Sequence, residues 1–304
     1  MPTSSLLFAL EVLRVGRIEY DALLPALVAA VIGDVTTRGL GVVHTPYPRV
    51  LALNMSPAVF GKWIVFGLIV GVVTLIFVEL LHRLKKIFEK RLPQLPVRMM
   101  VGGIAIVAMW KIAGTSDYLG LGVPTIVRAF VDPHLAWGAF AWKLVFTAVT
   151  LGSGFLGGEV TPLFFVGAAL GNVLARLLGL PLDLGAGMGL AAVFGAAANT
   201  PIALSIMAVE LLGSNVFPHV VIVAVVAYLA SGHRGIYPAQ LVGRAKMAGK
   251  RHDEVPLRDW NSDHDDELVE SLRLGASPDT STNERDAPPK DEAPPKGLSK
   301  SAKP

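Results

Sequence analysis

Long apolar runs alternate with short polar breaks over most of this chain. The longest run covers residues 58–81, and its only charged residues are Lys62 and Glu79, both near its ends. A run of this length crosses about 30 Å of hydrocarbon as a helix, because each residue adds about 1.5 Å. It therefore predicts a membrane-spanning helix.

The other apolar segments are shorter, and glycine or proline interrupts several of them. They cover residues 20–33, 99–113, 139–151, 160–180, 186–212 and 217–230. Non-helical backbone at membrane depth persists only where protein or a water-filled cavity satisfies its polar groups. The pattern predicts an all-α, polytopic membrane protein with broken and re-entrant helices, as in many transporters. Helix packing through small residues is the alternative explanation of the glycines.

Composition and charge agree with a membrane location. Hydrophobic residues make up 52% of the 304 residues and charged residues only 17%, which excludes an ordinary soluble domain. The charged residues gather in residues 82–98 and 244–304, and the first part of each of these two segments is mainly basic. By the positive-inside rule, we expect a multi-pass protein of the cell (inner or plasma) membrane with a cytoplasmic C-terminus. Residues 252–304 are rich in Asp, Glu, Lys, Ser and Pro, which predicts a disordered tail.

Several chemical classes are excluded by what the sequence lacks. It has no cysteine, so it can form neither a disulfide nor a thiolate metal site. No H-E-x-x-H, no G-x-S-x-G and no histidine pair at helical spacing is present, which argues against a membrane enzyme. No basic stripe with interleaved aromatic residues is present, so nucleic acid is not an expected partner. We expect no metal and no cofactor.

A short internal repeat links the N-terminus to residues 201–212. Pro2 and Glu11 match Pro201 and Glu210 at the same separation, and apolar residues between them match as well. Repeats in transporters commonly form inverted halves that meet at a substrate site. The second copy has residues 58–200 in front of it, whereas the first copy begins at Met1. We therefore expect the first repeat to be truncated. Chance similarity between two apolar helices is the alternative.

The densest motif is GSGFLGGEVTPLFFVGAALGN, residues 152–172. Small residues, including Gly154 and Gly158, make the approach irregular. Thr161 and Pro162 stand where a helix starts, because proline suits a first helical turn. Backbone N–H groups at such a start, with the helix dipole behind them, form an anion site.

These residues resemble the CLC family of anion channels and transporters. The run GEVTP at 158–162 is similar to the family's anion-binding motif G-x-F-x-P, and its Glu-Val variant resembles the fluoride/proton antiporter branch. The runs ANTPIA at 198–203 and SGHRGIY at 231–237 look like the same branch. The resemblance covers residues 2–243. It implies a CLC-type inverted-repeat fold whose second repeat is complete, whereas the first half's G-x-E-G motif with its gating glutamate has no match here.

The resemblance also implies roles for individual residues. The amides of Val160 and Thr161 would face the anion, and Tyr237 would donate its phenol O–H to the same ion. Glu159 would serve in proton coupling or anion selectivity, with stabilisation of the helix start as the alternative. We expect these groups to converge on one site that the 304 residues leave incomplete.

Three further polar residues suggest structural roles. Glu11 and Glu210 occupy equivalent helical positions, which predicts paired structural hydrogen bonding. Asn199 is predicted to cap the helix that follows it.

The chain thus divides into three parts. Residues 1–41 would form the last two helices of the first repeat, residues 42–243 the second repeat with the anion motif, and residues 244–304 the tail. The predicted function is fluoride export coupled to protons, as part of a CLC-type transporter that forms a two-fold homodimer in the lipid bilayer. A voltage-gated-type chloride channel, a chloride/proton antiporter and a non-transporting truncated remnant are the alternatives.

Overall fold

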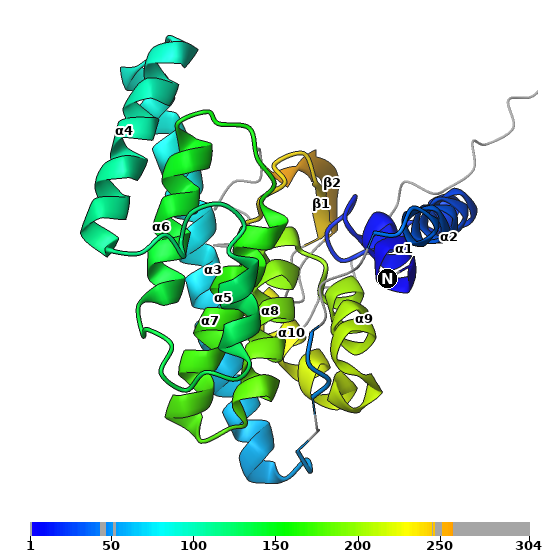
Figure 1. Ribbon diagram of the computed structural model, residues 1–304. Coiled ribbons are helices and arrows are strands. Elements are labelled where there is room, and N and C mark those ends of the chain that lie inside the picture. The colour runs from blue at the N-terminus through cyan, green and yellow to red at the C-terminus, as the bar shows by residue number, and fades with distance from the viewer. Residues whose placement is uncertain (1, 43–46, 51–52, 245, 247–250, 258–304) are drawn as a thin grey trace, which may run out of the picture.

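The computed structural model describes residues 2–42, 47–50, 53–244, 246 and 251–257, so most of the predicted tail lies outside the described residues. Ten α-helices and one small hairpin make up this part of the chain (Figure 1). Two single-turn 3-10 helices, Tyr20–Ala22 and Ser214–Val216, precede α2 and α10. The elements are α1 (Pro2–Glu11), α2 (Leu23–Gly39), α3 (Pro57–Arg91), α4 (Leu95–Ala113), α5 (Val123–Ala129), α6 (Ala139–Gly152), α7 (Val160–Leu178), α8 (Leu182–Ala198), α9 (Pro201–Leu212), α10 (Phe217–Ala230), β1 (Leu241–Arg244) and β2 (Arg251–Pro256).

The helical prediction is confirmed, with differences of detail. The apolar run 186–212 is divided into α8 and α9 at Asn199, because Pro201 cannot continue the preceding helix. The short helix α5 was not predicted. Strand β2 was not predicted either, and it pairs antiparallel with β1 across the predicted start of the tail at residue 244.

Helix α3 is the longest element. Its N-cap Ser56 accepts a hydrogen bond from the N–H of Val59 at 3.3 Å, and the helix then continues for 35 residues. That corresponds to about 52 Å, well beyond the roughly 30 Å of a hydrocarbon core. The helix is therefore tilted, or its basic C-terminal end stands outside the hydrocarbon. Among the described residues, four helical segments are long and apolar enough to span a membrane: α3, α4, α7, and α2 together with the 3-10 turn before it. Helices α6, α8, α9 and α10 are apolar but shorter.

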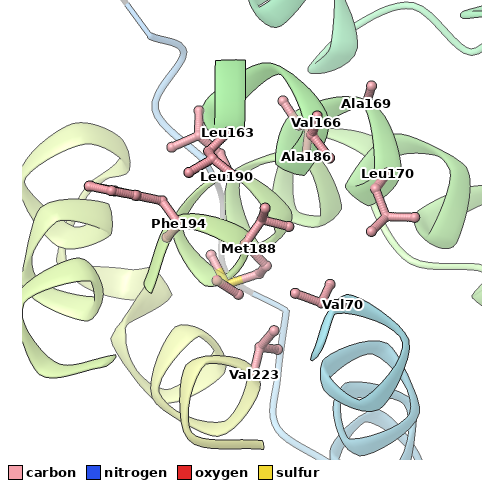
Figure 2. Packing of buried hydrophobic residues seen from close by; sticks show 14 of the residues in the cluster. Val70, Leu163, Val166, Ala169, Leu170, Ala186, Met188, Leu190, Phe194 and Val223 are labelled. Carbon is pink, nitrogen blue, oxygen red and sulfur yellow. The ribbon is translucent and has the colours of Figure 1, made fainter. Parts of the chain in front are cut away.

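Helices α7 and α8 form the centre of the core. A Cβ atom added at Gly167 would lie 2.3 Å from the carbonyl oxygen of Gly189, and one at Gly171 would lie 2.2 Å from that of Gly185. The two backbones therefore touch, and only glycine fits at these positions. Figure 2 shows apolar side chains of α7 and α8 packed together, with Val70 of α3 and Val223 of α10 below them. The labelled residues include Leu163, Val166, Leu170, Ala186, Met188, Leu190, Val70 and Val223.

Helices α1 and α9 cap each other. The Glu11 carboxylate accepts hydrogen bonds from the N–H groups of Ile202 (3.1 Å) and Ala203 (2.7 Å) at the start of α9. In return, Glu210 accepts from the N–H (3.2 Å) and hydroxyl (2.5 Å) of Ser4 at the start of α1. The predicted structural pairing of the two glutamates is confirmed. Each helix supplies at its C-terminal end the acceptor that the other needs at its N-terminal end.

Helix α2 packs against little besides α1. None of its residues is buried, and Figure 1 shows it beside α1 and away from α3 to α8. Its exposed apolar residues are Leu23, Leu24, Leu27, Val28, Val31, Ile32 and Val35. An apolar face of this kind contacts lipid or another membrane segment.

Candidate anion site

Helix α7 begins at Val160, as predicted. The first N–H groups of an α-helix have no acceptor within the helix, so those of Val160 and Thr161 can donate to a group outside α7. Glu159 occupies the N-cap position, but its side chain makes no capping hydrogen bond. That observation leaves its carboxylate available for another task.

The approach to α7 needs glycine at one of the two predicted motif positions. Gly154 has φ +94°, a left-handed conformation that side chains with a Cβ atom rarely adopt. An added Cβ there would also lie 2.8 Å from the side chain of Leu95. Around Gly158, by contrast, an added Cβ would meet no atom within 4 Å. Gly154 shapes the approach, whereas Gly158 leaves it open.

Tyr237 is held in place by the C-terminal end of α8. The N–H of Ile236 donates to the carbonyl of Ala197 at 2.9 Å. The side-chain Nε2 of Gln240 donates to the carbonyl of Ala198 at 2.7 Å. Tyr237 lies between these two attachments, so its backbone is fixed on both sides.

Asn199 also belongs to this attachment, and the prediction that it caps α9 is wrong. It has φ +57° and closes α8 in the left-handed conformation that is common after helix ends. Its side-chain amide donates to Gln240 at 3.0 Å instead of reaching α9. The N-cap of α9 is Thr200, which makes no side-chain cap, because Glu11 caps that helix.

An ion pair attaches the Tyr237 segment to α3. Arg234 forms a salt bridge with Glu79, and Glu79 also accepts from Arg83 at 2.5 Å. The segment before Tyr237 is thus attached to α3, the longest of the described helices.

A row of aromatic rings links Tyr237 to the first turns of α7. The rings of Tyr237 and Phe8 lie 6.4 Å apart, Phe8 stacks on Phe194 at 5.6 Å, and Phe194 meets Phe164 edge-on at 5.5 Å. No sequence pattern predicts this row, because its three phenylalanines come from the separate helices α1, α7 and α8. The Glu159 carboxylate is close enough to Tyr237 for its charge to act on the phenol. The structure therefore brings the start of α7 and Tyr237 into one neighbourhood.

The family model for "Voltage gated chloride channel" matches residues 1–232. The chain belongs to this family. It is 42% identical over 269 residues to a "Chloride/fluoride channel protein" of Pseudomonas syringae pv. tomato, covering 86% of this chain and 59% of the relative. It is 28% identical over 252 residues to a voltage-gated ClC-type chloride channel of Salmonella dublin, covering 78% of this chain and 60% of that relative.

Two solved structures are also similar. A CLC-type fluoride/proton antiporter superposes with a TM-score of 0.75 and 40% identity, covering 78% of this chain and 60% of that one. A slow cyanobacterial chloride/proton antiporter superposes with a TM-score of 0.56 and 20% identity, covering 70% and 52%, which shows the fold alone. The chain thus spans about 60% of the length of its relatives. The resemblance to the CLC family and the polytopic helical membrane fold are confirmed.

Proposed function

We propose that this chain forms part of a CLC-type transporter that exports fluoride in exchange for protons. The observation that carries the proposal is the neighbourhood of the α7 start and Tyr237. The α7 start offers N–H donors and the positive end of a helix dipole, and Tyr237 offers an O–H donor. Fluoride is a small ion that gives up its water only to close donors, and this set supplies them.

Glu159 gives the site a route to proton coupling. Its carboxylate stands at the N-cap of α7 without a capping hydrogen bond, one residue before the proposed anion contacts. A negative carboxylate repels an anion and a protonated one does not, so proton binding and anion binding favour each other there. We infer a proton-coupling or selectivity role for Glu159.

The surroundings of the transporter follow from the same reasoning. We place the chain in the cell membrane with its C-terminus in the cytoplasm, because the basic end of α3 and the basic residues after α10 suit that side. We also propose a two-fold homodimer with α2 near the partner, because the apolar face of α2 is otherwise uncovered. Light scattering on detergent-purified protein tests the dimer, and a monomer would contradict it.

Ion flux from liposomes tests the function. The protein, expressed from its full reading frame, is reconstituted with fluoride or chloride inside, and an ion-selective electrode follows efflux while a dye follows internal pH. We expect fluoride efflux with proton uptake, and chloride efflux at least tenfold slower. In Glu159→Gln we expect the coupling to fall, because the side chain keeps its shape but no longer titrates.

Chloride transport is the second candidate, favoured by the similarity to ClC-type chloride channels. Chloride efflux as fast as fluoride efflux would support it. Proton-independent flux would identify a channel rather than an antiporter.

A further inference from the structure

The segment that leads into the proposed anion site, residues 153–159, lies beside the basic end of α3. Gly152, at the end of α6, contacts this helix: an added Cβ would lie 3.1 Å from Leu84 and 3.4 Å from the backbone nitrogen of Lys85. The exposed Lys85 side chain is close enough to Glu159 for the two charges to interact. A positive charge is therefore present where the segment reaches α7.

Arg98, in the first turn of α4, touches the same segment. An added Cβ at Gly154 would lie 3.0 Å from Nη2 and 3.1 Å from Nε of Arg98, so the guanidinium lies against the Gly154 backbone. Nη1 of Arg98 lies 3.7 Å from a carboxylate oxygen of Glu89. Nε is buried and has no hydrogen-bond partner among the described residues. A buried guanidinium donor without an acceptor is costly, so this arrangement suits an anionic ligand.

The segment is exposed between Gly154, which Arg98 contacts, and the start of α7. Residues 156–158 are exposed, and Leu156 is fully so. Space also remains around Gly158. An ion that approaches here meets the basic side chains first and then the N–H groups at the start of α7.

We propose that Arg98 and Lys85 form the entrance of the anion pathway, where a small monovalent anion binds before it moves to Val160 and Thr161. Positive side chains at a narrow opening raise the local concentration of anions, and a guanidinium adds directed N–H donors. The proposal deepens the proposed function and rests on it. It assigns binding to Arg98, which no sequence motif indicated.

The absence of cysteine allows a direct measurement of the local potential. Leu156→Cys places a single thiol at the opening, and methanethiosulfonate reagents that carry one negative or one positive charge then report the potential through their reaction rates. We expect Arg98→Gln and Lys85→Gln each to lower the ratio of anionic to cationic reaction rates by about three- to tenfold, the effect of one charge several ångströms away in water. Molar salt should reduce the difference, because it screens charges beyond about 3 Å.

Two variants make the result specific. Lys86→Gln removes a charge that is also exposed from the neighbouring position of α3, and we expect its ratio to stay within about twofold of the parent. Arg98→Lys keeps the charge and should keep most of the ratio, which separates charge from packing. A ratio that is unchanged in Arg98→Gln and Lys85→Gln, or lowered equally by Lys86→Gln, would overturn the proposal.

Flux measurements separate this proposal from the proposed function. If both hold, Arg98→Gln slows fluoride efflux several-fold at low fluoride and leaves the maximal rate within about twofold. If the protein exports fluoride but the ratio of anionic to cationic reaction rates does not change in Arg98→Gln and Lys85→Gln, the proposed function holds and the proposed entrance is rejected. A responsive ratio in a protein that moves chloride but not fluoride would keep the entrance and reject the fluoride assignment.

Discussion

Gly154 and Gly158 stand four residues apart in the same motif, yet the structure gives them different roles. Gly154 needs its left-handed backbone and has Leu95 and Arg98 against it, whereas Gly158 has open space. Gly154→Ala should therefore lower the free energy of unfolding by about 1–3 kcal/mol. Gly158→Ala is the matched control and should stay within about 0.5 kcal/mol. Thermal unfolding in detergent measures both, and equal losses would contradict the described geometry.

At the scale of elements, the mutual capping of α1 and α9 depends on two carboxylates. Glu210→Gln weakens the charged acceptor for the first turn of α1, and Glu11→Gln does the same for α9. We expect each change to cost about 1–2 kcal/mol, because hydrogen bonds to a charged group are the stronger ones. Asp21→Asn, at an exposed position of the first 3-10 helix, should change stability little. Urea or thermal unfolding measures the three variants, and a loss of stability in Asp21→Asn as large as in Glu11→Gln and Glu210→Gln would contradict this account.

The attachment of the Tyr237 segment to α3 gives a second test at this scale. Arg234 and Arg83 both bind Glu79, but only Arg234 belongs to the segment that carries Tyr237. Arg234→Gln should therefore raise the fluoride concentration for half-maximal efflux by about three- to tenfold, the effect of about 1 kcal/mol. Arg83→Gln should leave it nearly unchanged. Equal effects would mean that Glu79 acts through general stability rather than by positioning Tyr237.

Sequence reasoning succeeded at the element scale where a local pattern decides the structure. The span within α3 follows from an unbroken apolar run, and the start of α7 follows from Thr161 and Pro162. Asn199 was misassigned because an asparagine between two helices can close the first or cap the second, and the distant Glu11 already caps the second. The hairpin of β1 and β2, the aromatic row and the contact of Arg98 with Gly154 depend on residues that only the fold brings together.

At the scale of the whole molecule, the fold places the two halves of the proposed site on separate supports. The α7 start rests on the close contact of α7 with α8, and Tyr237 rests on the C-terminal end of α8 and on α3. Helix α8 is common to both, so its position sets the distance between the N–H donors and the phenol. The central claim is that these donors hold one ion together.

A double-mutant cycle on fluoride transport tests that claim most directly. Fluoride efflux from liposomes is measured for Thr161→Ala, which removes the hydroxyl donor beside the first N–H groups of α7, for Tyr237→Phe, and for the double variant, all expressed from the full reading frame. Donors to the same ion are coupled, so we expect each single change to slow efflux at least tenfold and the double change to slow it much less than the product of the two. Effects that multiply independently, or a Tyr237→Phe variant with parental efflux, would show that the α7 start and Tyr237 do not share an anion.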